Sequence, residues 1–233
     1  MNFHIEKELF KYFPGMKIIA VYAENIGEAD TEKIADMLSK AWQTAGAAAK
    51  KYGNAQSHPY IKPWGERMKA VGANRKQFPS SIEAMVRRAG KGGKPFHINP
   101  MVDFYNAISL KYLVTAGAYD VDRLENDMWL RFSKAGDTFT ALDSDESIPI
   151  PAGEVSYADG DKIITRHYVY KQSKHALLTD DSKNVIFVSE ILGELPEETA
   201  AEVAQAITDG LKTCFGIDTV AVILDEDNLS MYP

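Results

Sequence analysis

Three polar side chains recur every third residue in an otherwise apolar stretch that follows Asn99-Pro100. They are Asp103, Asn106 and Ser109, and in a helix this spacing places them roughly on one face. Polar groups on a buried face must be satisfied by the fold or by a ligand. A carboxylate, an amide and a hydroxyl can bind an amino group, orient a water molecule and stabilise an oxyanion. The row is therefore a candidate pocket wall.

These residues also have structural interpretations. Asparagine directly before a proline is a favoured helix N-cap, so for Asn99 the capping role is preferred over ligand binding. Asp103 can anchor neighbouring backbone N–H groups, and that role is also the preferred one. Asn106, in the middle of the predicted helix, is the stronger pocket candidate.

A second candidate group lies further along the chain. Glu154 follows Gly153 at the start of a predicted strand, where it can receive an amino group or a hydroxyl, or pair with Arg166 as a structural bridge. Alternation along the next strand places four side chains on one face: Arg166, Tyr168, Tyr170 and Gln172. Such a row can line a pocket, stack on the bases of a single-stranded RNA end or face solvent. His167 falls on the opposite face and is not predicted to be catalytic.

Charge is distributed unevenly along the chain. Residues 62–94 hold nine basic and two acidic residues, a net +7 within a protein of net charge -7, so the remainder carries -14. Such a stretch can meet a phosphate backbone at one face only, although a solvated helical surface is the preferred interpretation on charge alone. The candidates for phosphate contact are Arg87, Arg88, Lys91 and Lys94.

Several chemistries have no motif in this chain. There is no phosphate-binding glycine loop, no G-x-S-x-G elbow and no H-E-x-x-H pair, and the five histidines show no metal-ligand spacing. The sequence therefore predicts no metal, no cofactor and no serine nucleophile of the elbow type. A single cysteine, Cys214, excludes an internal disulfide and favours a reducing compartment. With no apolar run long enough to span a membrane, we expect a cytoplasmic protein.

The order of predicted elements indicates an α+β fold, because helices dominate the first half and short strands the second, with a strand near each end. We expect helices packed on a mostly antiparallel or mixed sheet, in a single domain over residues 1–233. Helices are predicted at about 30–52, 64–71, 80–90, 99–114 and 196–216. Strands are predicted at 16–23, 128–132, 138–142, 154–158, 162–170, 184–190 and 219–224, the first and last of them buried.

The segment PFHINPMVDFYNAISL at residues 95–110, continuing to Ala118-Tyr119-Asp120, resembles the B3/B4 domain of the phenylalanyl-tRNA synthetase β subunit. Further blocks fit free-standing members of that family: SSIEAM at 80–85, GEVSYAD at 153–159, RHYVYKQS at 166–173 and the run 179–189. The resemblance covers roughly residues 58–193. Its most specific part is the N-P-x-V-D-x-x-N-x-x-S string.

The resemblance implies tRNA binding and editing, the hydrolysis of a wrongly attached amino acid, tyrosine in place of phenylalanine. It implies an α+β lobe with a pocket between the motif helix and the sheet. Nothing in the chain is similar to the aminoacylation core, so synthetase activity is not implied. An aminoacyl ester is already activated, so the polar groups described above would suffice for its hydrolysis.

One residue departs from the family pattern. The synthetase domain has a histidine just before the A-F-D tripeptide, and that histidine helps to hold the editing substrate; here the aligned residue is Gly117. Two hypotheses stay open. The first is a tRNA-binding quality-control protein that hydrolyses mischarged aminoacyl-tRNA in trans. The second is a non-catalytic module that binds an amino-acid-like ligand or RNA.

Overall fold

The computed structural model describes all 233 residues. Its five α-helices are α1 (Thr31–Lys51), α2 (Lys62–Ala70), α3 (Ser81–Gly90), α4 (Pro100–Tyr112) and α5 (Thr199–Phe215). Three short 3-10 helices occupy Lys7–Lys11, Ala55–Ser57 and Val121–Arg123. None of the helices combines the length and the apolar character that crossing a bilayer requires.

The strands form two sheets. The smaller is antiparallel, in the order β11 (Ala221–Leu224), β2 (Lys17–Ala23), β10 (Val185–Ile191) and β3 (Thr115–Asp120). The larger runs β12 (Ser230–Met231), β1 (Phe3–Ile5), β4 (Met128–Phe132), β7 (Val155–Asp159), β8 (Lys162–Arg166), β5 (Thr138–Thr140) and β6 (Ser147–Pro149). In it β9 (Lys171–Gln172) also pairs with β8, while the β1–β4 and β5–β8 pairs are parallel. The predicted α+β class with mixed and antiparallel sheets is confirmed.

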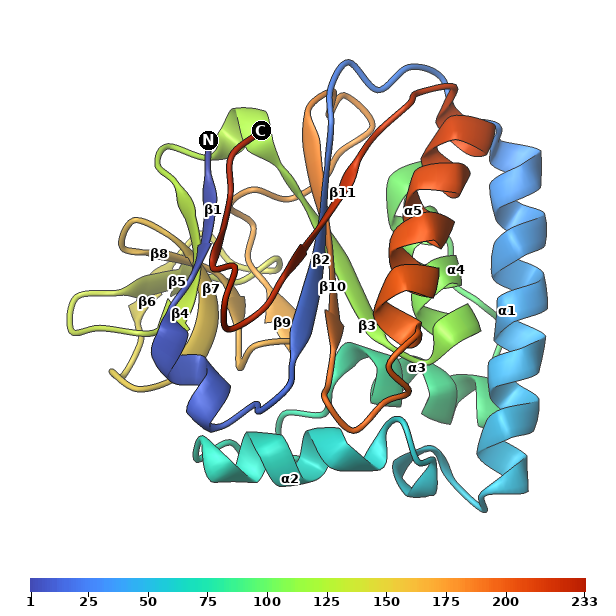
Figure 1. The fold of residues 1–233 in the computed structure, drawn as a ribbon, viewed down its shortest axis with the longest axis horizontal. Helices are drawn as coiled ribbons and strands as arrows, with labels where there is room; N and C mark the ends of the chain where they lie inside the picture. The colour runs from blue at the N-terminus through green and yellow to red at the C-terminus, as the bar shows by residue number, and fades with distance from the viewer.

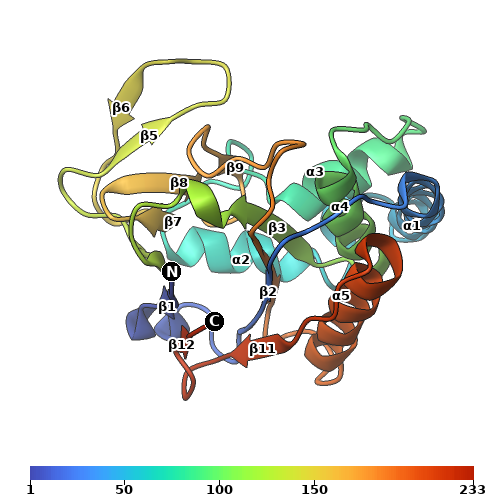
Figure 2. The ribbon, with the colours of Figure 1, turned by 90° about the horizontal axis from the view of Figure 1, so that it is seen from above.

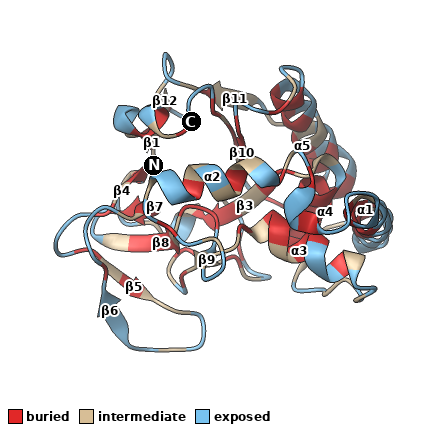
Figure 3. Cartoon of the chain, turned by 90° about the horizontal axis from the view of Figure 1, so that it is seen from below, coloured by how far each residue is buried: buried red, intermediate tan, exposed pale blue.

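The smaller sheet lies between the helices and the larger sheet. Figure 1 shows α1, α4 and α5 on one side of β2, β10 and β3, the larger sheet on the other, and α2 running beneath both. Every residue of β10 is buried, as expected for a strand covered on both faces. Figure 3 shows buried residues gathered between the layers, whereas β6 at the far edge is exposed. One hydrophobic core therefore joins both sheets and all five helices.

The predicted helix starts at Asp30, Ser80 and Asn99 are confirmed, whereas the last helix begins at Thr199 rather than at Pro196 and the second at Lys62 rather than at residue 64. Asp30 and Asn99 cap α1 and α4 through their side chains, and Gly216 ends α5 in the left-handed conformation at φ 70°. Ser80 caps α3 by accepting the Glu83 N–H, but the expected reciprocal bond of a capping box is absent. The Glu83 carboxylate, 1% exposed, instead accepts hydrogen bonds from Arg75 and Gln56, because a buried charge needs cationic or amide partners.

Two segments differ from prediction near the motif helix and the C-terminus. Helix α4 ends at Tyr112 rather than at Val114, with Leu113 left-handed at φ 57°. Gly117 does not break a helix: it lies in strand β3, opposite Val188 of β10. The predicted strand at 219–224 begins at Ala221 and is an edge strand, only partly buried, because nothing pairs with its outer side.

Candidate functional site

A cavity of about 290 Å³ lies between α4, the first turns of α3 and the two sheets, where the family resemblance implies a pocket. Helix α4 lines it with Val102, Tyr105 and Asn106, and β3 lines it with residues 115–119. Strand β10 contributes Val188 and Glu190, the larger sheet contributes Tyr157, Thr165 and Gln172, and the turn at residues 168–170 completes the lining. The walls are mostly apolar with a few polar groups, which is the composition of small-molecule sites.

Asn106 is the polar residue of α4 that faces this cavity. The helix is buried on nearly every side, and Asn106 is 7% exposed. Its amide takes part in none of the hydrogen bonds of the protein and stays accessible from the cavity that it lines. Buried amides are normally hydrogen-bonded, so the open donor and acceptor of Asn106 are available to a ligand.

Glu190 places a buried carboxyl group in the cavity wall. The residue is 3% exposed, and its oxygens accept hydrogen bonds from Thr115 Oγ1 and from the Tyr157 hydroxyl, both at 2.6 Å. Burial raises the pKa of Glu190, an effect that the two hydrogen bonds only partly oppose. A carboxyl group held by two hydroxyl groups can give up one of these hydrogen bonds and form one with a polar group of a ligand instead.

Five tyrosines line the same space: the exposed Tyr170 and four others, which are Tyr105, Tyr119, Tyr157 and Tyr168. Burial raises the pKa of each of these four, so all four are neutral hydroxyls at physiological pH. The Tyr119 hydroxyl lies 2.8 Å from Thr165 Oγ1, and Tyr168 donates to the Met16 sulfur at 2.7 Å. Tyr105 has no hydrogen-bond partner in the protein. Its hydroxyl is a second open polar group beside Asn106.

Gly117 also lines the cavity, and its missing side chain leaves room. Its φ is not left-handed, and a Cβ atom built at this position would meet no heavy atom within 4 Å. The backbone therefore does not require glycine here. Glycine instead leaves the cavity without a side chain at the position where the family pattern has a histidine.

The model of the B3/4 domain matches residues 63–204, more than half of the chain. The chain belongs to the B3/4 domain family. No curated protein matches it. An N-terminal fragment of the phenylalanyl-tRNA synthetase β-subunit from Pyrococcus horikoshii is structurally similar, with a TM-score of 0.48 and 9% identity over 94% of this chain. The similar region spans 49% of that fragment, so this chain corresponds to about half its length.

Three predicted pocket residues of the B3/4 motif helix serve the fold instead of lining the cavity. Asn99 accepts the Val102 N–H at 2.9 Å as the N-cap. Asp103 accepts the Ile98 N–H and lies 2.8 Å from His97 Nδ1, which fixes the loop before the helix. Ser109 donates to the Val114 carbonyl and ties the end of α4 to β3.

The predicted row from Arg166 to Gln172 is not a continuous strand. Strand β8 ends at Arg166, and His167 and Tyr168 are left-handed at φ 45° and 61°. This turn breaks the alternation, so Tyr168 is fully buried beside the cavity while Arg166 points away from it. Gln172 lines the cavity from β9 and donates to the Ala118 carbonyl at 3.2 Å.

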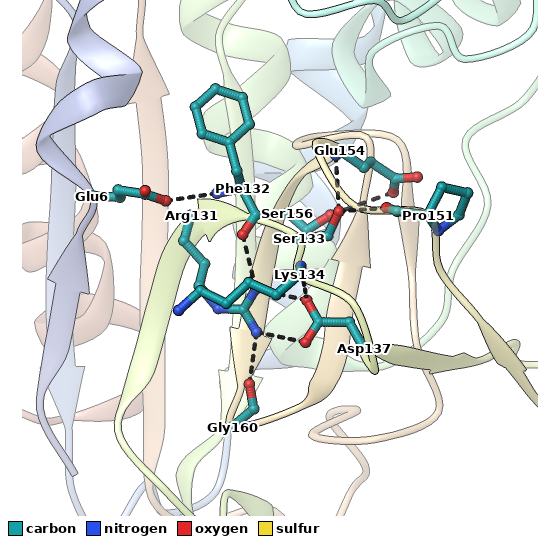
Figure 4. Close-up of polar contacts among 10 residues, drawn as sticks. All are labelled: Glu6, Arg131, Phe132, Ser133, Lys134, Asp137, Pro151, Glu154, Ser156 and Gly160. Atoms are coloured by element: carbon teal, nitrogen blue, oxygen red, sulfur yellow. Dashed lines mark hydrogen bonds and ion pairs between the residues drawn. The ribbon is translucent and has the colours of Figure 1, made fainter.

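Glu154 forms the structural bridge rather than a wall of the B3/4 cavity. It precedes β7 and accepts hydrogen bonds from Arg166 Nη2 at 2.7 Å and from the His167 N–H at 2.8 Å. Figure 4 shows how Ser133 joins the adjacent turns, donating to the Pro151 carbonyl and accepting the Glu154 N–H. The same view shows the buried Arg131–Asp137 pair that holds the β4–β5 turn. The pair Glu154–Arg166 thereby fixes the turn that directs Tyr168 inward.

The four basic candidates form a second feature of the site. All are exposed at the last turn of α3 and in the loop after it, and none takes part in an ion pair: Arg87, Arg88, Lys91 and Lys94. The Arg88 guanidinium lies 5.3 Å from the centre of the Phe96 ring, and Phe96 lines the cavity. Of the four cations, Arg88 therefore adjoins the cavity wall.

The sequence-based search missed Glu190, Tyr105, Tyr119 and Tyr157 as cavity residues. A signal for Glu190 was present: it is the only charged residue of the apolar strand β10 and shares the parity of Val188, which also lines the cavity. No group of His, Cys, Asp and Glu side chains is arranged to hold a metal ion.

Proposed function

We propose that this B3/4 protein binds the aminoacylated 3′ end of a tRNA and hydrolyses a wrongly attached amino acid in trans. The observation that carries the proposal is the open amide of Asn106 inside a cavity whose wall residue Phe96 packs against Arg88, one of four exposed cations without an ion-pair partner. The phosphate backbone of a nucleic acid is attracted to the cations, and a small group with a polar end fits the cavity.

The cavity suits an amino-acid moiety rather than a nucleotide. At about 290 Å³ it lies at the lower limit of ordinary ligand pockets. Its walls offer aromatic rings for a side chain and a few hydroxyl and amide groups for the polar atoms. Glu190 gives the cavity a means of selecting a hydroxyl on that side chain, since its carboxyl already holds two hydroxyl groups.

Hydrolysis in this cavity needs a water molecule and an oxyanion site. Water adds to the ester carbonyl, the bond to the ribose oxygen breaks, and the products are the free amino acid and the tRNA hydroxyl. The Asn106 amide and the Tyr105 hydroxyl are two neighbouring donors on α4 without protein partners, so they are suited to hold the oxyanion. Water orientation and substrate positioning provide the remaining catalysis.

A second function is favoured by one observation: no histidine lines the cavity, and Gly117 leaves the family's histidine position empty. This is the non-catalytic module, which binds an amino-acid-like ligand without cleaving an ester. Such a protein would keep a pocket that recognises the ligand and would lack a turnover step.

Deacylation of a panel of charged tRNAs by the purified protein tests the proposal. The panel includes correctly charged species and tyrosine on phenylalanine tRNA. Selective release of one wrong amino acid, lost in Asn106→Ala and kept in Ser109→Ala, supports editing in trans. No release from any species by the folded protein, together with saturable binding of a free amino acid, would instead support the binding module.

A further inference from the structure

A second hollow, of about 460 Å³, opens in the larger sheet where β5 separates from β8. The two strands pair at one register only, Thr138 with Lys162, and the chain rejoins the sheet through a bridge between Ala141 and Ser173. Between these points the strands diverge. Figure 2 shows the β5–β6 hairpin projecting away from β8 and β9.

The lining of this hollow is almost entirely polar and contains no carboxylate. Its principal groups are Lys162, Lys174, His175, Thr138, Thr140 and Ser147. The hydroxyls of Thr138, Thr140 and Ser147 donate to no protein acceptor. Ammonium groups and hydroxyls are the side chains that hold phosphate oxygens.

The acids that pair with these cations lie outside the lining. Lys174 pairs with Asp145, whose side chain is 98% exposed, and Lys162 pairs with the exposed Glu125. Exposed ion pairs of this kind contribute little stability, so either lysine can exchange its partner for a ligand oxygen. The acid beside His175 is Asp159, which is fully buried and already accepts hydrogen bonds from the backbone N–H groups of Glu125 and Asn126.

We propose that this hollow, defined by Lys162, Lys174, His175 and the hydroxyls of Thr138, Thr140 and Ser147, binds a phosphate group. Lys162 of β8 and Lys174, which follows β9, supply charge, and three hydroxyls of β5 and β6 supply donors. Although each lysine has an acid partner, those acids lie outside the lining, which itself presents ammonium and hydroxyl groups to a ligand and so favours an anion.

The position of the hollow connects it with the cavity beside α4. Ile163 lines the hollow and Thr165 lines the cavity, two residues apart on β8 and so roughly 7 Å from each other. Gln172 of the cavity and Ser173 of the hollow are consecutive. Resting on the proposed function, the phosphate is assigned to the nucleic-acid strand whose 3′ end enters the cavity. A free nucleotide is the other source of the same chemistry.

The first measurement uses phosphate alone. The imidazole NMR signals of His175, assigned with His175→Gln, are followed while sodium phosphate or AMP replaces sodium chloride at constant ionic strength and pH. We expect saturable shifts in the wild-type protein and none in the double variant Lys162→Met/Lys174→Met. This readout depends on neither tRNA binding nor ester hydrolysis, so it distinguishes failure of the phosphate site from failure of the proposed function.

The second measurement uses a fluorescein-labelled acceptor-stem RNA with a single-stranded 3′ end. Lys162→Met/Lys174→Met should weaken binding roughly fivefold at 0.1 M salt and lower the salt slope by about 0.7, the effect of one phosphate contact to a single strand. The matched control is Lys40→Met/Lys212→Met, which removes two exposed, acid-paired lysines from α1 and α5 on the opposite side of the molecule (Figure 1). The control should bind like the wild type.

The two measurements together distinguish a phosphate site that binds RNA, a phosphate site that binds a free ligand, and no phosphate site. Phosphate-dependent shifts together with weakened RNA binding support the site and its assignment to RNA. Shifts together with unchanged RNA binding support the phosphate site but assign it to a free nucleotide or free phosphate instead of RNA. If phosphate and AMP shift nothing and the double variant binds RNA like the control, the proposal is overturned.

Discussion

The Tyr157 hydroxyl lies 2.6 Å from Glu190 Oε1, and the two residues come from different sheets. Both are buried, and both line the cavity beside α4. The bond thus joins the larger and smaller sheets at the wall of the proposed site. Any change to it is expected to affect the pocket and the packing of the two sheets together.

Replacing Glu190 with Gln should change how stability varies with pH. Burial raises the pKa of Glu190 in the folded state, so the folded protein binds more protons than the unfolded chain. The stabilisation that this carboxyl group contributes is therefore fully present below the unfolded-state pKa of about 4.3. It is lost as the pH rises through the folded-state pKa. Glu190→Gln carries no such group.

The stability of Glu190→Gln relative to the wild type should therefore increase with pH above about 4.3, by up to about 1.4 kcal/mol per pH unit, and level off above the folded pKa. Urea unfolding of both proteins between pH 4 and 8 measures this difference. A difference that stays constant across the range, or that changes in the opposite direction, would contradict a raised pKa at Glu190.

Two substitutions on α4 should separate binding from stability. Asn106→Ala removes no protein hydrogen bond, so the free energy of unfolding should change by about 1 kcal/mol or less. The rate of deacylation should fall roughly 10²-fold if the amide holds the oxyanion. Ser109→Ala removes the buried bond to the Val114 carbonyl and should cost about 1 kcal/mol with activity kept. Denaturant unfolding and single-turnover deacylation check both variants, and a reversed pattern would assign the pocket role to Ser109.

Gly117→His should be accepted by the fold and should raise the rate of ester cleavage. A Cβ at this position meets open space, and the imidazole would add a polar group to a cavity that has no histidine. We expect thermal unfolding close to that of the wild type and faster release of the wrong amino acid. Gly210→Ala is the contrasting control, because its Cβ would collide with the Phe104 ring and lower stability. A folded Gly117→His protein with an unchanged rate would show that the empty position does not limit hydrolysis.

Removing the unpaired cations of α3 should weaken tRNA binding in a salt-dependent manner. Arg87→Gln/Lys91→Gln leaves Arg88 on the Phe96 ring, so the cavity wall keeps its packing. Each lost phosphate contact should lower the salt slope by about 1, measured by filter binding between 50 and 300 mM salt. Binding of a free amino acid should be unchanged, and an unaltered salt slope would place the tRNA backbone elsewhere.

Much of the framework follows from local sequence. The helix starts at Asp30, Ser80 and Asn99 were predictable because capping depends on side chains within a few residues of the backbone groups that they satisfy. The motif helix and the family itself were predictable for the same reason, since the identifying string is contiguous. Asn106 was the stronger pocket candidate on that helix, and the structure places it in the cavity wall.

The sequence by itself determined the helices, most strands, the α+β class and the B3/4 family. Only the tertiary structure decided which polar residues face the cavity. Strand β3 forms because β10 pairs with it, the left-handed turn at His167 and Tyr168 is tied by Glu154, and Glu190 meets Tyr157 across two sheets. Each of these contacts joins residues from 13 to 75 positions apart, and their register is set by packing between layers, which no local pattern encodes.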